Sequence, residues 1–175
     1  MSRSDRFSNK SVHSIHVRQH TWVPWATNLK FIMTLSEIQE QVRKDLKIND
    51  LELDIESLRI PSLHSKYLQL LTEHSLLLKK TQGEYAVLKR NKWIYYTGKA
   101  PEEVYKEKGD FPLKLKTKDE ERTFIEADEE VRELKGKVEY YETVVEYLQE
   151  VVKSISNRSF QIKNAIEWRK FEAGI

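Results

Sequence analysis

A heptad repeat of apolar residues between Val131 and Ile166 constrains the fold of this chain more than any other feature. Apolar or aromatic side chains recur at alternating steps of three and four residues. Ten of the eleven positions in this register carry one, and Ser159 is the exception. This spacing is typical of a helix that winds around another helix. No proline interrupts the run, and a helix of about 40 residues would be roughly 60 Å long.

Two arrangements could bury this seam. An earlier helix of the same chain could fold back on it as a hairpin, or the helix could associate with further copies of the chain. We favour self-association, because a seam of this length exceeds what a small domain is expected to cover, and because Val144, Val151 and Phe160 widen the apolar stripe. The predicted oligomerisation helix covers about residues 118–171, and its predicted interface residues are Val138, Tyr141, Val145, Leu148, Val152, Ile155, Ile162, Ile166, Trp168 and Phe171.

Composition favours an all-α protein. The 175 residues include only five glycines and four prolines, few for a protein with many tight turns. There is no cysteine, which excludes disulfides, thiol nucleophiles and cysteine zinc sites and suits a reducing cytoplasm. No apolar run approaches the roughly 20 residues of a membrane span, and the N-terminus lacks the apolar centre of a signal peptide.

The chain divides into two predicted regions. Residues 1–32 are basic and show no helical or strand period, so we expect a disordered N-terminal extension. Residues 33–175 are expected to form a single helical domain. It opens at Thr34, where the pattern Thr-x-x-Glu is a capping box, and a first helix is expected over residues 35–46.

Further helix boundaries follow from local signals. Pro61 should hold the preceding residue in extended geometry, so the second helix is expected over about residues 62–96 with Ser62 as its N-cap. Glycines and prolines mark residues 97–116 as a long loop that could include one helical turn. A second capping box at Thr117 should open the third helix, and Asp128 marks a break or a second start within it.

Charge is sorted along the chain in a way that the total of +2 hides. The net formal charges are +4 for residues 1–32, −3 for 33–78, +6 for 79–118 and −5 for 119–175. Within the basic region, residues 79–99 combine six cations with aromatic rings, and we call them the basic-aromatic segment. Cations that follow phosphates and rings that stack on unpaired bases are what single-stranded nucleic acid requires. The residues predicted to bind DNA are Lys79, Lys80, Lys89, Arg90, Lys92, Trp93, Tyr95, Tyr96 and Lys99.

No catalytic pattern is present. The sequence lacks a Walker-type phosphate loop, a Gly-x-Ser-x-Gly elbow and a His-Glu-x-x-His motif, so an enzyme is not expected. His13, His16 and His20 have a spacing that could hold a metal on a helix, but an unstructured tail is the simpler interpretation. We expect no cofactor.

Three stretches give the chain a resemblance to the UvsY family of phage recombination mediators. The first is the opening helix from Met33, and the second is Tyr95-Tyr96-Thr97-Gly98 with the basic residues before it. The third is the tail, where the family pattern Arg-x-Phe-x-Ile-Lys…Arg-x-Phe-Glu-Ala-Gly is matched by Arg158, Phe160, Ile162, Lys163, Arg169, Phe171, Glu172, Ala173 and Gly174. The resemblance covers about residues 33–175.

The resemblance implies a function and partners. It implies a ring-like homo-oligomer of six or seven subunits that binds single-stranded DNA in the infected bacterial host cell. Such a ring would load a RecA-like recombinase onto DNA covered by single-strand-binding protein, without membrane or cofactor. It places the DNA-contacting basic pair at Arg90 and Lys92. Relative to the family pattern, arginine stands for lysine at the first position and lysine for arginine at the second, so the charges are kept but the guanidinium and ammonium groups change places. The competing interpretation is a coiled-coil scaffold or interaction protein without DNA binding.

Overall fold

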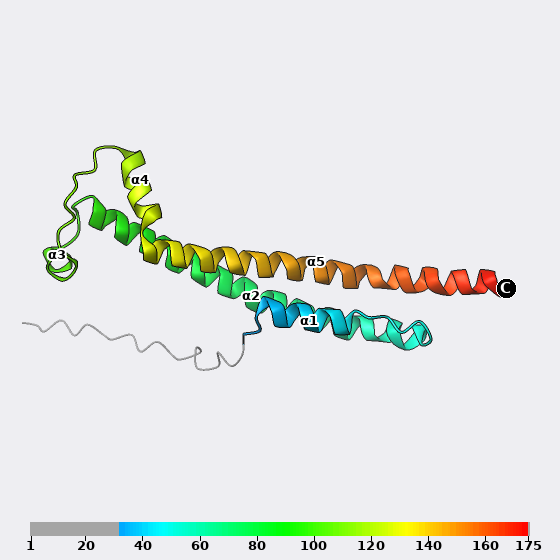
Figure 1. Cartoon of the computed structure of the whole chain (residues 1–175). Coiled ribbons are helices and arrows are strands. Elements are labelled where there is room, and N and C mark those ends of the chain that lie inside the picture. The colour runs from blue at the N-terminus through cyan, green and yellow to red at the C-terminus, as the bar shows by residue number, and fades with distance from the viewer. Residues whose placement is uncertain (1–31, 175) are drawn as a thin grey trace, which may run out of the picture. The chain divides into compact units, whose positions relative to one another are not determined.

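The computed structural model describes residues 32–174, which contain five α-helices and no strand. Residues from Thr34 onward form one compact unit, in which two helices of 44 residues run antiparallel as a hairpin (Figure 1). The all-α fold with a long C-terminal helix is confirmed. In chain order the helices are α1 (Leu35–Asp45), α2 (Leu53–Tyr96), α3 (Glu102–Lys108), α4 (Lys118–Ala127) and α5 (Glu129–Glu172).

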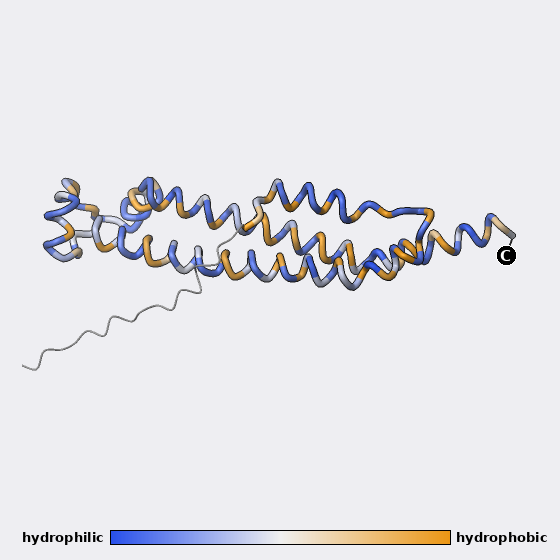
Figure 2. Tube along the Cα trace, turned by 90° about the horizontal axis from the view of Figure 1, so that it is seen from below, coloured by the Kyte–Doolittle hydropathy of each residue, from blue (hydrophilic) through white to orange (hydrophobic). Residues whose placement is uncertain are grey.

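The heptad seam of α5 is buried largely within the chain itself. Leu148 and Ile155 have no exposed surface, and Ile162 is also buried. Apolar and polar residues alternate around both long helices, as expected for helices that bury one face each (Figure 2). The hairpin alternative therefore accounts for residues 131–162. The argument that the seam is too long for one chain is wrong, because α2 is as long as α5 and packs along it.

Helix α1 lies along one half of the hairpin, where it forms a three-helix arrangement with α2 and α5 (Figure 1). Its Ile38 and Val42 are buried, as is Tyr67 of α2. Helix α5 also satisfies an orphan backbone group at the start of α1, since the Leu35 amide donates to the Tyr140 hydroxyl at 2.9 Å. The expected first helix and its capping box, in which the Thr34 hydroxyl accepts from the Glu37 amide, are confirmed.

Helix α2 begins earlier than the sequence predicts. It starts at Leu53 and continues through Pro61, so the expected extended geometry before the proline and the N-cap at Ser62 are both wrong. Proline removes one helical hydrogen bond, but buried side chains on both sides of it, Leu53 and Leu63 among them, hold the helix together. Tertiary burial of these apolar groups outweighs the local preference.

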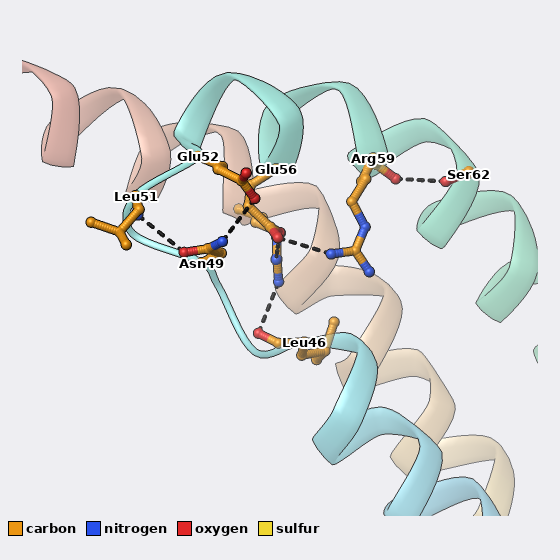
Figure 3. A network of polar contacts seen from close by, with 8 residues as sticks. Leu46, Asn49, Leu51, Glu52, Glu56, Arg59 and Ser62 are labelled. Atoms are coloured by element: carbon orange, nitrogen blue, oxygen red, sulfur yellow. Dashed lines mark hydrogen bonds and ion pairs between the residues drawn. The ribbon is translucent and has the colours of Figure 1, made fainter.

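The turn between α1 and α2 is fixed by a polar network (Figure 3). Asn49 accepts from the Leu51 amide at 3.1 Å and donates to the Glu52 carboxylate at 2.8 Å. Below this turn lies Glu56, which is 3% exposed and pairs with Arg59 at 2.8 Å and with Arg158 of α5. Arg158 also donates to the Leu46 carbonyl at 2.9 Å. One buried arginine thus joins the end of α1, the first turns of α2 and the C-terminal third of α5.

The other end of the hairpin carries the connection between α2 and α5. The predicted loop at 97–116 is confirmed and includes the short helix α3. The second capping box is present, with the Thr117 hydroxyl accepting from the Glu120 amide. Asp128 breaks the predicted third helix: it ends α4 and caps α5 by accepting from the Val131 amide.

Candidate nucleic-acid interface

The basic-aromatic segment forms the last turns of α2 and the turn that ends it. The Lys99 amide donates to the Ile94 carbonyl at 3.0 Å, and the Gly98 amide donates to the Tyr95 carbonyl at 3.2 Å. These two bonds close the helix as a Schellman motif. Gly98 has a φ of 74°, a backbone conformation that residues with a side chain rarely adopt. The turn positions Lys99 beside the aromatic residues of the segment.

Several predicted DNA-binding cations are exposed. Lys79, Lys80, Arg90 and Lys99 are exposed, and Lys89 is half-buried with its Nζ 5.9 Å from the centre of the Tyr85 ring. Arg90 makes one long hydrogen bond, to the side chain of its neighbour Asn91 at 3.5 Å. These residues carry positive charge on the surface of a helix, where it can follow a phosphate backbone.

Lys92 occupies a different environment from the other cations. Its side chain is 11% exposed, and its Nζ lies 2.8 Å from carboxylate oxygens of both Asp128 and Glu130. Tyr96 donates to the same Asp128 carboxylate at 2.8 Å. Lys92 was predicted to present its charge to a phosphate, but in this structure two carboxylates of the chain already pair with its ammonium group.

The pKa values of this network follow from its contacts. Burial opposes the charged form of Lys92, but hydrogen bonds to Asp128 and Glu130 outweigh it and raise the Lys92 pKa. Burial likewise opposes the charged form of Asp128, but the hydrogen bonds from Lys92 and Tyr96 hold its pKa below the ordinary value. Burial and the hydrogen bond to Asp128 raise the pKa of Tyr96 to about 12.

We expect this network to make folding stability depend on pH. The lowered pKa of Asp128 contributes stability that is present above the unfolded-state value of about 4 and is lost as the pH falls through the folded-state value. The raised pKa of Lys92 contributes stability that is present below about 10.5 and lost above it. Urea unfolding followed by circular dichroism between pH 7 and pH 2 should show a smaller loss of unfolding free energy on acidification in Asp128→Asn. Asp119→Asn, at a position 88% exposed, is the control and should behave like the unmodified chain. Identical acid dependence in Asp128→Asn would contradict this assignment.

The aromatic residues of the segment are also engaged within the chain. Trp93 is 37% exposed, its indole N–H donates to Glu121 of α4 at 2.8 Å, and the Lys99 ammonium lies 4.1 Å from the centre of its ring. Tyr95 stacks on Tyr105 of α3 with ring centres 5.6 Å apart. Of the predicted stacking rings, Trp93 is the most accessible, while the two tyrosines help to hold the connection.

Two cavities border these rings. One, of about 690 Å³, lies among the end of α2, α3 and the start of α5 and includes Lys92 and Glu130 in its lining. The other, of about 520 Å³, lies between Tyr95, Tyr96 and the chain around Phe111. The end of α2 is therefore a hollowed surface with aromatic walls.

The predicted oligomerisation residues divide into two groups. Within the single chain the structure buries Val138, Val145, Leu148, Ile155 and Ile162 and leaves Tyr141 and Val152 half-buried. The last turns of α5 project past the turn between α1 and α2 (Figures 1 and 2). There the exposed apolar residues are Ile166 (37%), Trp168 (62%) and Phe171 (74%).

Sequence reasoning missed the buried pair of Arg158 and Glu56 and the carboxylates at the basic-aromatic segment. Arg158 belongs to the tail motif, but an arginine in a helical repeat normally indicates a surface position. Glu121 and Glu130 lie in the acidic region that follows residue 118. The alternation of basic and acidic segments along the sequence could have indicated these contacts, because oppositely charged segments of one chain attract each other.

The comparisons with known proteins decide the family. The family model described as "Recombination, repair and ssDNA binding protein UvsY" matches residues 41–175. This chain belongs to the UvsY family. The recombination protein uvsY of Enterobacteria phage T4 is 26% identical over 145 residues, which cover 81% of this chain and 99% of that protein.

Solved UvsY structures share the fold. A crystal structure of the bacteriophage T4 recombination mediator protein UvsY aligns with a TM-score of 0.72 at 24% identity, covering 81% of this chain and 98% of that one. A second lattice of the same protein aligns with a TM-score of 0.68 at 22% identity, covering 80% of this chain and 99% of that one. The family is described as a recombination, repair and DNA-binding protein rather than as an enzyme.

Residues 32–174 contain no candidate metal site and no candidate membrane span. No group of histidines, aspartates and glutamates there is placed to hold a metal ion, and none of the helices there has a stretch apolar enough for a membrane span. The N-terminal histidines of the sequence prediction, and the predicted extension over residues 1–32 except its last residue, lie outside the described residues.

Proposed function

We propose that this chain binds single-stranded DNA through the basic-aromatic segment, without sequence preference. The observation that carries the proposal is the set of exposed cations on the C-terminal half of α2 and in the turn after it, together with the partly exposed Trp93, in a chain of the UvsY family. Cations on a helix surface neutralise successive phosphates, and a partly exposed indole offers a stacking face to any base. The proposed contacts are Lys79, Lys80, Lys89, Arg90, Trp93 and Lys99.

The wider role that we propose is that of a recombination mediator. A homo-oligomer, in the form of a ring of six or seven subunits, would present the segment several times, and weak contacts would add through avidity. The ring would weaken the hold of single-strand-binding protein on the DNA and favour the filament of a RecA-like recombinase. No covalent step is needed, because differential affinity for two states of the DNA suffices to shift their populations. The exposed apolar end of α5 supports the oligomer.

The salt dependence of DNA binding tests the first proposal. Replacing Lys79 and Arg90 together by alanine should weaken binding to homopolymeric oligonucleotides. It should also reduce the slope of log affinity against log salt by about one to two for each subunit that contacts DNA. Lys44→Ala with Lys153→Ala is the matched control, since it removes two cations that are 74% and 70% exposed on α1 and α5. A slope equal to that of the control would mean that the segment is only a solvated helix end, as the scaffold interpretation requires.

A further inference from the structure

The carboxylates of α4 and of the start of α5 contact the basic-aromatic segment directly. Glu121 accepts from the Trp93 indole at 2.8 Å, and Glu130 lies 2.8 Å from the Lys92 ammonium. Glu130 also lies 3.9 Å from the Lys108 ammonium. Three donors around the end of α2 therefore face two carboxylates that come from beyond the connecting loop.

A carboxylate and a phosphate offer these donors the same chemistry. Both present anionic oxygens that accept from an ammonium group or an indole N–H. Trp93 and Lys92 were predicted to face DNA, and in this structure their polar atoms are already occupied by anionic oxygens of the chain. Each contact has one partner that solvent reaches, since Trp93 is 37% exposed and the Glu130 side chain is 59% exposed.

We propose that Glu121 and Glu130 occupy two phosphate positions of the DNA site, so that bound DNA displaces them from Trp93 and Lys92. This inference rests on the proposed function and adds a competition inside the chain. Asp128 stays in place in this scheme, because it caps α5 and keeps Lys92 paired at one side. Helix α4, which carries Glu121 and only one buried residue, Ile125, is the element that moves.

The competition lowers DNA affinity by the free energy needed to break the internal contacts. The Glu121 contact is a hydrogen bond from a neutral indole, and the Glu130 side chain is 59% exposed, so the effect of each carboxylate is modest. We expect Glu121→Gln with Glu130→Gln to raise affinity for single-stranded DNA by about two- to tenfold. Glutamine keeps the shape and one acceptor oxygen, so the Trp93 hydrogen bond can persist in the free protein while the anionic competitor is gone.

The matched control is Glu126→Gln with Glu129→Gln. It removes one carboxylate from each of the same two helices, at exposed positions whose side chains make no hydrogen bond or ion pair within the described residues. Both double variants raise the net charge by the same amount. Any increase in DNA affinity that comes only from the more positive net charge is therefore the same in both. The probe is a fluorescently labelled oligo(dT), titrated at fixed salt and followed by anisotropy.

Two outcomes would overturn the inference while leaving the proposed function intact. One is an affinity of the Glu121→Gln/Glu130→Gln chain no higher than that of the control. The other, measured by hydrogen exchange on the unmodified protein, is that α4 becomes more protected or stays unchanged when oligo(dT) binds, since displacement of α4 should make its amides exchange faster. An unmodified chain that does not bind oligo(dT) at all would contradict the proposed function itself, and the inference with it.

Discussion

Replacing Trp168 and Phe171 by glutamine is expected to break the proposed oligomer and to lower affinity for single-stranded DNA by about 10²–10⁴-fold, although every DNA contact remains in place. The two rings are 62% and 74% exposed on the projecting end of α5 and lie 5.8 Å apart, centre to centre. Two large apolar groups side by side in water indicate a surface that another chain covers. A ring would bury them on a neighbouring subunit, and its loss would remove the avidity of repeated segments.

These two positions test the oligomer without disturbing the fold. Substitutions at Leu148 or Ile155 would not, because both side chains are fully buried within the chain and their loss would unfold the hairpin. Sedimentation velocity and an oligonucleotide titration measure the two expected effects, and circular dichroism checks that helix content is kept. Leu68→Gln with Leu76→Gln, at exposed positions of α2, is the control for a general loss of apolar surface. A double variant that keeps its oligomeric state would move the interface elsewhere, and one that is monomeric yet binds DNA as tightly as before would refute the role of avidity.

Replacing Arg158 by methionine is expected to lower the free energy of unfolding by about 3–4 kcal/mol. Both side chains of its pair with Glu56 are 4% exposed, so the substitution leaves a buried carboxylate without its principal partner. It also leaves the Leu46 carbonyl without the donor at 2.9 Å. Arg59 still reaches Glu56, at 2.8 Å, which places the loss at the lower end of the range for a broken buried pair.

A compensating substitution distinguishes charge from packing. Glu56→Leu combined with Arg158→Met should recover most of the lost stability, because replacing a buried ion pair by apolar side chains of similar volume is often neutral. Urea unfolding at one fixed protein concentration is the measurement, since association makes stability depend on concentration. Arg132→Met, at an exposed position of α5, is the control. If the free energy of unfolding of Arg158→Met lies within about 1 kcal/mol of that of the control, the pair of Arg158 and Glu56 does not hold the three helices together.

The sequence predicted the elements whose signals are local. The capping boxes at Thr34 and Thr117 and the break at Asp128 are confirmed, because each depends on hydrogen bonds within one helical turn. The start of α2 could not be predicted locally. Pro61 favours a boundary in an isolated peptide, and the burial of side chains on both sides of it, Leu53 and Leu63 among them, carries the helix through it.

The partner of the heptad seam could not be predicted either. Periodicity shows that Val138 or Ile155 must be covered, but the same period arises whether the covering helix belongs to the same chain or to another. For the basic-aromatic segment, residue type alone could not separate Arg90, which is exposed, from Lys92, which two carboxylates enclose. That difference depends on contacts with a helix about 38 residues away in the sequence.

The antiparallel hairpin also sets the order in which its contacts can form. Near the connection, Lys92 meets a residue 38 positions away, whereas at the open end Glu56 meets Arg158 across 102 positions. Closing a longer loop costs more chain entropy, although the cost grows only slowly with length. Contacts between α2 and α5 should therefore form first near α4 and last near the turn after α1. They should break in the opposite order. The buried pair of Arg158 and Glu56 then stabilises the end of the hairpin that forms last.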